Sequence, residues 1–320
     1  MNDARIDCLC LGIVVADHVC EPIDHLPRSG ELVLTERTRL TLGGCAANVA
    51  VDLARLGRRT AVVGRVGDDP FGTFVAEELQ RSGVDTRHLL ATPDEATSCS
   101  MIVNVTGDDR RFIHARGANA SLSGLEISAE LLRQTRVVYV GGYCLSDQPA
   151  PVNIAALFRR AAEMGVKTVL DVVIPRPANY GPFLEPVLPW TDVFLPNRDE
   201  AELITGEKDP VRQSLHFREA GAKSVVITCG VEGSVTAAAA GQFRSRGFEV
   251  AQVDATGSGD AFAAGYIHGL LEGADVLECV RIGSALGASC VRSTGATTGV
   301  FHAHELADFL ATHPFESRAL

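Results

Sequence analysis

Lysine is nearly missing from this 320-residue chain, whose 29 basic residues include lysines only at positions 167, 208 and 223. None of them follows a glycine, so a Walker-type phosphate loop, which needs a glycine–lysine pair, is excluded. The arginines are scattered, in runs no longer than pairs such as Arg58-Arg59. The net charge is −11 and no basic stripe is present. A surface of that charge repels phosphates, so we expect no nucleic-acid partner.

Long apolar runs and paired cysteines are also lacking. No run reaches the roughly 18 residues that cross a bilayer, so we expect no membrane partner. The nine cysteines are odd in number and form no CxxC pair, which argues against a disulfide framework or a zinc ribbon. Cys8 and Cys10 are spaced to point the same way from a strand into a core. The first residues lack the layout of a secretory signal, and we expect a cytoplasmic protein with free thiols.

Short β-branched runs alternate with helical patterns along most of the chain. Hydrophobic residues make up 46% and charged residues 22%, which are ordinary values for a globular protein. Strands are expected at 6–15, 60–66, 137–141, 167–172, 193–195, 224–228 and 248–253, and helices at 45–56, 71–82, 151–163, 197–205, 258–271, 276–290 and 303–311. This alternation predicts an α/β fold, a doubly wound and mostly parallel sheet with helices on both faces.

Two stretches, 31–41 and 98–114, break the alternation. They carry β-type residues with no helix between strands, and a turn signal lies at 106–109. Both features indicate short antiparallel hairpins. Together the two stretches predict a small β-sheet outside the main one.

The strongest local signal is the segment DATGSGDAF, residues 254–262. The amides of Gly257, Ser258 and Gly259 are expected to point outward from a helix N-terminus, where a phosphate is favoured. Asp260 lies beside that anion site and suits the removal of a proton from an attacking alcohol. A capped helix with glycines for close packing is the alternative. The segment matches neither the GxGxxG dinucleotide motif nor the GxSxG nucleophile motif.

Two further segments carry polar residues at the start of expected helices. Gly43 and Gly44 open a helix of small residues, in which Asn48 suits a polyhydroxylated ligand or, alternatively, a bond to neighbouring backbone. Asn197 and Glu200 lie three residues apart. Their oxygens suit Mg²⁺, directly or through water, and the same spacing suits a capping box with no ligand.

Acidic residues also follow two expected strands. Asp17 comes at the end of the first strand and Asp171 at the end of the strand at 167–172. Open α/β sheets bind their ligands at the carboxyl ends of strands. Both carboxylates are therefore candidates for ligand contacts. His302 and His304, an isolated HxH pair, are expected on the surface because a third metal ligand is lacking.

In their order and spacing, these segments resemble the ribokinase-like family of sugar kinases from about Asp7 to Ala296. The first family signature resembles residues 43–56, with a companion at 66–72, and the second resembles 254–262. The resemblance implies a single kinase domain over residues 1–320.

That domain would carry a small β-sheet lid, here at about 17–43 and 97–118. The resemblance also implies transfer of the ATP γ-phosphate to a hydroxyl of a small sugar-like acceptor, usually a CH₂OH group.

The resemblance also implies a role for each candidate residue. The catalytic set would be the general base Asp260 with the anion-hole residues Gly257, Ser258 and Gly259. The sugar hydroxyls would be held by Asp17, Gly43, Gly44 and Asn48. The nucleotide and Mg²⁺ would be held by Asn197, Glu200, Thr228, Gly230 and Gly233, with Glu200 acting on Mg²⁺ through water. A monovalent cation, K⁺ in many members, would be held by Asp254 and Thr256.

This chain departs from the family pattern in places that concern the acceptor. Val15 stands where ribokinases proper have an asparagine, and residues 171–176 lack the asparagine of the DxNxR motif of fructokinase-like members. The acceptor is therefore left as a sugar or sugar derivative. A nucleoside kinase is the alternative, with Phe112 and Tyr143 as the aromatic candidates for base stacking.

Two further expectations concern the protein as a whole. A non-catalytic sugar or nucleotide sensor is the alternative from another class, and the presence of Asp260 argues against it. Exposed edges of the small sheet also allow a homodimer through the lid.

Overall fold

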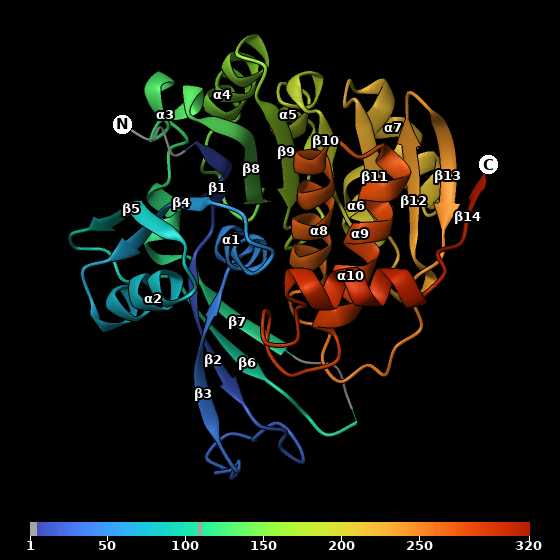
Figure 1. Cartoon of the computed structure of the whole chain (residues 1–320). Coiled ribbons are helices and arrows are strands. Elements are labelled where there is room, and N and C mark those ends of the chain that lie inside the picture. Colours follow the sequence, from blue (N-terminus) through green and yellow to red (C-terminus); the bar gives the residue numbers. More distant parts are fainter. Residues whose placement is uncertain (1–4, 108–110) are drawn as a thin grey trace.

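The computed structural model describes residues 5–107 and 111–320, and two β-sheets organise them (Figure 1). The large sheet has the strand order β14-β13-β12-β11-β10-β9-β8-β1-β4-β5, and the small sheet has the order β3-β2-β6-β7. The strands of the large sheet are β1 Ile6–Gly12, β4 Thr60–Gly67, β5 Asp85–Thr92, β8 Thr135–Tyr143, β9 Lys167–Val172, β10 Val193–Phe194, β11 Ser224–Thr228, β12 Ser234–Ala238, β13 Gly241–Ser245 and β14 Ser317–Ala319. Those of the small sheet are β2 Val15–Cys20, β3 Thr38–Gly43, β6 Cys99–Val103 and β7 Arg111–Ala115.

Helices cover both faces of the large sheet (Figure 1). They are α1 Cys45–Arg55, α2 Pro70–Arg81, α3 Ala129–Arg133, α4 Pro151–Glu163, α5 Gly181–Leu184, α6 Arg198–Thr205, α7 Pro210–Glu219, α8 Ser258–Glu272, α9 Val276–Cys290 and α10 Ala303–Thr312. In β1, Cys8 and Cys10 join the apolar layer under α1, α8 and α9, whereas Leu9 and Leu11 join the layer under α4 and α7. This alternation confirms the predicted doubly wound sheet, because a sheet buried on both faces sends successive side chains to opposite layers.

The strand order places a crevice beside the first strand. β1 pairs in parallel with β4 on one side and with β8 on the other, and the chain then continues outward to β9, β10 and β11. Ligands of open α/β sheets bind at the carboxyl ends of strands where the order reverses in this way. The small sheet projects from the same end of β1 (Figure 1).

The small sheet exists as predicted, and the hairpin expected within 98–114 is confirmed as β6 and β7, whereas the hairpin expected within 31–41 is not formed. β2 pairs antiparallel with β3 and parallel with β6, and β6 forms a hairpin with β7. Residues 31–37 form no strand, and Leu32 and Leu34 are exposed, so a hairpin within 31–41 is wrong. β3 instead finds its partner in β2. Of the expected turn at 106–109, residues 108 and 109 lie outside the described residues.

Two expected strands of the large sheet are corrected by the structure. The single strand at 6–15 is two strands, because Gly12 has φ +148° and the chain leaves the main sheet there. Residues 248–253 form no strand. Phe248 packs instead against Phe309 and Phe315, with ring centroids 5.0 and 5.7 Å away. Phe248 thus contributes to an aromatic cluster, and residues 248–253 do not pair with a strand of either sheet.

Three further features concern the cysteines, the isolated histidine pair and the length of the helices. All nine cysteines are free. His302 and His304 are exposed, as expected. Over residues 5–107 and 111–320, no helix is both long enough and apolar enough to cross a bilayer.

Candidate functional site

Helix α8 begins at a turn that only glycine can form. Gly257, its N-cap, has φ +79°, and a Cβ there would lie 2.3 Å from the carbonyl oxygen of Ala296. Gly259 is exposed, and no described heavy atom lies within 4 Å of where its Cβ would stand. The turn is therefore open to the surface at Gly259. A helix start of this kind offers amide donors and partial positive charge to an anion.

The residues just before this turn hold one another in place. Asp254 Oδ1 accepts hydrogen bonds from the amide of Thr256 at 2.9 Å and from its hydroxyl at 2.6 Å. Its Oδ2 accepts one from the amide of Gly295 at 3.0 Å. These contacts join the turn to the loop after α9. The monovalent-cation role of Asp254 and Thr256 remains a prediction.

On the small sheet, Asp17 belongs to a row of polar residues that crosses all four strands. Asp17 is paired with Thr41 on β3 and with Ser100 on β6, and Ser100 is paired with His114 on β7. Residues paired in this way share one face of a sheet. The Ser100 hydroxyl and His114 Nδ1 are 3.1 Å apart. The row thus ties the candidate sugar-binding carboxylate to every strand of the small sheet.

The Asp17 carboxyl is only 8% exposed. Burial raises its pKa to about 6; a hydrogen bond with Ser100 acts in the opposite direction, and the charge of Asp260 adds to the rise. Gly43 makes room for this carboxyl, because a Cβ at Gly43 would lie 1.9 Å from Asp17 Oδ2. Gly44 has φ +93° and begins α1 beside the backbone of Ile13. Close contacts with Asp17 and Ile13 therefore explain why positions 43 and 44 are glycines, and the sequence alone did not reveal these contacts.

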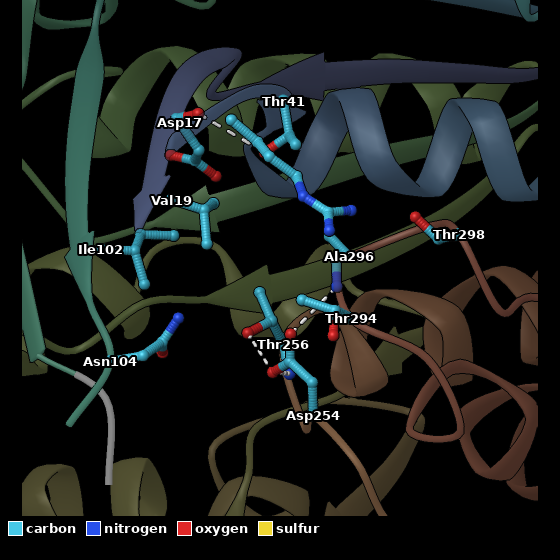
Figure 2. A pocket seen from close by; sticks show the side chains of 12 residues that line it. Asp17, Val19, Thr41, Ile102, Asn104, Asp254, Thr256, Thr294, Ala296 and Thr298 are labelled. Atoms are coloured by element: carbon cyan, nitrogen blue, oxygen red, sulfur yellow. Dashed lines mark hydrogen bonds between the residues drawn. The ribbon is translucent and has the colours of Figure 1, made fainter. Parts of the chain in front are cut away.

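A cavity of about 60 Å³ lies between the small sheet and the loop after α9. Figure 2 shows Asp17 and Thr41 on one wall, and Asp254, Thr256 and Ala296 on the other. The structure therefore brings a predicted sugar contact and the predicted cation contacts to one pocket, although they are more than 200 residues apart in the sequence.

Asp260, in the first turn of α8, contacts α1 directly. Asn48 Nδ2 donates a hydrogen bond to Asp260 Oδ2 at 2.7 Å. Burial raises the pKa of Asp260, and hydrogen bonds from Asn48 and from the thiol of Cys45 oppose that rise. A base with a raised pKa binds a proton more tightly, which suits the transfer of a proton from an alcohol.

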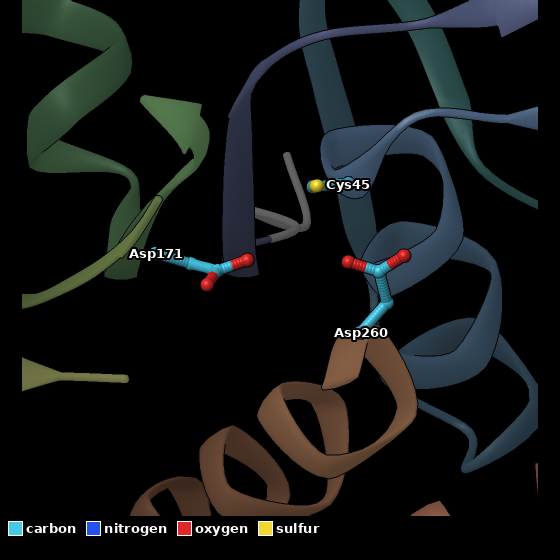
Figure 3. Close-up of side chains that lie close together, drawn as sticks. All are labelled: Cys45, Asp171 and Asp260. Carbon is cyan, nitrogen blue, oxygen red and sulfur yellow. The ribbon is translucent and has the colours of Figure 1, made fainter. Parts of the chain in front are cut away.

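Two carboxyl groups and a thiol converge near the start of α8. Atoms of Cys45, Asp171 and Asp260 lie within 4.8 Å of one another, and Figure 3 shows the two carboxylates facing each other below the thiol. Tyr139 donates a hydrogen bond to Asp171 Oδ2 at 2.8 Å. Burial raises the pKa of Asp171 well above its usual range, and the charges of Glu200 and Asp260 raise it further.

The predicted nucleotide residues lie at the carboxyl ends of β10 and β11. Asn197 and Glu200 form the capping box of α6: Asn197 Oδ1 accepts from the Glu200 amide at 2.8 Å, and Glu200 Oε2 accepts from the Asn197 amide at 2.9 Å. The ligand-free alternative is thus present. Burial also raises the pKa of Glu200 to about 7. Asn197 forms an isolated parallel β-bridge with Thr228, so the two residues lie side by side at the carboxyl end of the large sheet.

The two predicted nucleotide glycines differ in their surroundings. Gly230 has φ +57°, and no described heavy atom lies near its Cβ position. Gly233 has φ +94°, and its Cβ would lie 2.1 Å from the carbonyl oxygen of Ser245, so close packing already accounts for a glycine there. The nucleotide contacts of these residues remain predictions.

One aromatic candidate for base stacking is corrected. Tyr143 is buried, and its hydroxyl donates to the Phe183 carbonyl at 3.0 Å, so its ring is not available to a ligand. Phe112, on β7, is 53% exposed. Cys45 and Tyr139 also lie at the candidate site and were not predicted from the sequence. An unusual thiol directly after paired glycines was the only signal for Cys45, and Tyr139 looks like any core residue of a strand.

Comparison with known proteins gives a family match over most of the chain. A sequence profile described as pfkB family carbohydrate kinase matches residues 5–302. A ribokinase of Haemophilus influenzae is 30% identical over 307 residues, which cover 94% of this chain and 97% of the relative. A 2-dehydro-3-deoxygluconokinase of Bacillus subtilis is 30% identical over 280 residues, 84% of this chain and 86% of the relative.

A solved structure shares the fold. The ribokinase of Arabidopsis thaliana, complexed with ribose and ATP, superposes with a TM-score of 0.84 at 24% identity, covering 97% of this chain and 100% of the other. That similarity extends over both the large and the small sheet.

Proposed function

Since the chain belongs to the pfkB family of carbohydrate kinases and is an ATP-dependent sugar kinase, we propose that it phosphorylates a CH₂OH hydroxyl of an uncharged sugar or sugar derivative, with Asp260 as general base. The observation that supports this most directly is the position of Asp260, held by Asn48 beside the open N-terminal turn of α8. A carboxylate and an anion-binding turn then flank one point from two sides. That is the arrangement a phosphoryl transfer to an alcohol needs.

In this mechanism Asp260 accepts the hydroxyl proton as the acceptor oxygen attacks the γ-phosphate. Asn48 and the Cys45 thiol hold the Asp260 carboxylate in place. The start of α8, with Gly257, Ser258 and Gly259, stabilises the negative charge of the transferred group. ATP supplies that group, and Mg²⁺ neutralises part of its charge.

The carboxyl groups of Asp171 and Glu200 suit the binding of a divalent cation. Part of the rise in the Asp171 pKa comes from the charge of Glu200, and a cation would relieve this repulsion. Carboxylate oxygens are the ligands that Mg²⁺ prefers. We therefore assign Glu200 and Asp171 to hold Mg²⁺, directly or through water, with Asn197, Thr228, Gly230 and Gly233 along the nucleotide.

The acceptor is held by Asp17, Gly43, Gly44 and Asn48. We propose that it is uncharged because the groups that face it are mainly acidic. Arg39 lines the same cavity, but it pairs with Glu21 at 2.7 Å. A carboxylate or phosphate on the acceptor would therefore meet the negative charges of Asp17 and Asp260, which would repel it.

The small sheet is proposed to act as the lid of a single domain over residues 1–320, with lid segments at about 17–43 and 97–118. Its outer face supports a homodimer through the lid: Leu40, Met101 and Ile113 are exposed there and lie in one cross-strand row with His18. A row of exposed apolar side chains is typical of an interaction surface.

We further propose a K⁺ site at Asp254 and Thr256. From the nine free thiols we also propose a cytoplasmic location.

A panel of acceptors tests the proposed function. We expect ATP consumption, measured in a coupled assay with Mg²⁺, to depend on an uncharged ketose or aldose and to be weak with sugar acids. Nucleosides form a separate arm, because the exposed Phe112 would favour them if it stacks on a base. Each arm is run with and without K⁺. Turnover with sugar acids alone, or with no acceptor at all, would contradict the proposal.

The pH dependence of the reaction is expected to reflect the raised pKa values in the site. Asp17 has a pKa of about 6 and Glu200 of about 7, and both act as carboxylates in the mechanism. As the pH falls through these values they gain protons, so kcat/KM should decline below about pH 7 rather than near the usual carboxyl value of about 4. The measurement is kcat/KM between pH 4.5 and 9 on this protein, with the coupling enzymes shown not to limit the rate. A profile that stays flat down to pH 5 would show that these groups do not titrate as described.

A further inference from the structure

Asp52, on α1, is a buried carboxyl without a visible partner. It is 0% exposed, and neither of its oxygens has a hydrogen-bond partner among the described residues. Burial raises the pKa of Asp52 well above its usual range, and the charge of Asp260 raises it further. An ionised carboxylate is very unfavourable in such a place, which favours the neutral, protonated form of this side chain.

A second unpartnered atom lies one helical turn earlier. Asn48 is 4% exposed, and its Oδ1 is buried without a donor among the described residues, although its Nδ2 donates to Asp260. Residues four apart on a helix are neighbours on one face. A protonated carboxyl carries an O–H donor, which is what Asn48 Oδ1 lacks, whereas a carboxylate could only present a second acceptor.

We propose that Asp52 is a positioning residue for the kinase reaction: its protonated carboxyl donates a hydrogen bond to Asn48 Oδ1, and so fixes the amide in the orientation in which Nδ2 faces Asp260. The proposal rests on the proposed role of Asp260 as general base. Without the donor, the Asn48 amide can turn over and present its oxygen to the Asp260 carboxylate. Two acceptors would then face each other, and the base would lose its support.

Charged and titratable groups reach Asp52 from three sides. Asp260 acts from the start of α8 and Arg55 from α1 itself. The thiol of Cys290 lies on α9, and burial, the largest cause, raises its pKa. Arg55 is engaged elsewhere, since it donates to the carbonyl oxygens of Thr297 and Val300. Among the described residues Arg55 forms no hydrogen bond with Asp52, and its charge only partly opposes the rise in the Asp52 pKa, which favours the protonated form.

Substitutions at Asp52 test the hydrogen bond through the kinetics. In Asp52→Asn the new NH₂ group can still donate to Asn48, so kcat should stay within about twofold of the unmodified protein. In Asp52→Ala the donor is lost and the Asn48 amide can turn away from Asp260. We expect kcat to fall about 10-fold with the sugar KM nearly unchanged, because the hydrogen bond from Asn48 to the charged Asp260 is weakened. Val51→Ala, a buried apolar truncation on the same helix, is the control for helix destabilisation and should keep kcat.

Unfolding in urea tests the proton itself, without any need for activity. In the unfolded chain Asp52 ionises near pH 4, whereas the folded protein retains the proton, so unfolding releases one proton above that pH. Stability contributed by Asp52 is therefore present at low pH and is lost as the pH rises toward the folded pKa. Relative to Asp52→Asn, the unfolding constant of the unmodified protein should rise by up to tenfold per pH unit.

The kinetic and unfolding experiments on the Asp52 variants each have an outcome that contradicts the proposal. Unchanged kcat in Asp52→Ala, a loss in Asp52→Asn as large as in Asp52→Ala, or parallel stability profiles would each overturn the role of Asp52. If Asp52→Ala does not fold, the comparison of Asp52→Asn with the unmodified protein still decides. If the unmodified protein consumes no ATP with any acceptor, the proposed function fails, while the unfolding comparison still reports whether Asp52 is protonated.

Discussion

Replacement of Asp260 by alanine is expected to lower kcat by about 10²–10⁴, the usual contribution of a general base. The carboxylate lies in the first turn of α8 and is held by Asn48 at 2.7 Å, so its removal deletes the proposed proton acceptor and leaves the helix start in place. The sugar KM should change much less than kcat, because the proposed hydroxyl contacts at Asp17 remain. Steady-state kinetics with saturating ATP and Mg²⁺ measure both constants.

Two further variants make this test specific to the base. Asp260→Asn keeps the size of the side chain and its contact with α1 but cannot accept the proton, so it should be nearly as slow as the alanine variant. Asp308→Asn removes an exposed carboxylate on α10 and serves as the matched control for lost charge. Turnover of Asp260→Ala within a few-fold of the unmodified protein would remove Asp260 from its role as base.

Replacement of Gly43 by alanine is expected to raise the sugar KM by about 10- to 100-fold. The new Cβ would lie 1.9 Å from Asp17 Oδ2, a distance that forces the carboxylate out of its position. Loss of a hydrogen bond between a charged group and a sugar hydroxyl accounts for a change of this size. The KM for ATP should stay nearly constant, because the nucleotide residues lie on the other side of the site, at β10 and β11.

A double-mutant cycle with Asp17→Ala separates the steric cause from other effects of the alanine. Once the Asp17 carboxylate is absent, the Gly43 substitution has nothing to displace, so it should add little to the KM of Asp17→Ala. Residues in contact show this kind of non-additivity, whereas independent sites add. Fully additive effects would show that Gly43 acts through the backbone of α1 and not through Asp17.

The sequence predicted features that depend on local chemistry. Strand and helix alternation is visible because each period reflects which side of an element is buried. The glycine-rich starts of α1 and α8 are visible because positive φ angles and close backbone approach demand glycine. The Gly257–Gly259 turn was therefore correctly predicted to lie at a helix start. Asp260 and Asn48 were correctly placed near helix starts as well, because they lie within four residues of the glycines that begin these helices.

Other features depended on partners that no local pattern names. The run at 248–253 has strand-forming residues, yet Phe248 packs on Phe309 and Phe315. Tyr143 looked available to a ligand, yet tertiary packing buries it. Asp52 has no distinguishing pattern in the sequence at all. The role proposed for Asp52 depends on its burial near Asn48 and Asp260, and this burial arises only in the tertiary structure.

By itself, then, the sequence determined the class of the sheet, the two helix starts and most of the residues of the candidate site. Only the tertiary structure decided which of these residues meet. Asn48 and Asp260 are 212 positions apart, and they touch because α1 and α8 cover the same face of the sheet beside β1. Asp171 joins them because β9 is two strands away from β1 in the order. Strand order follows from long-range packing of whole layers, and short segments of sequence carry no record of it.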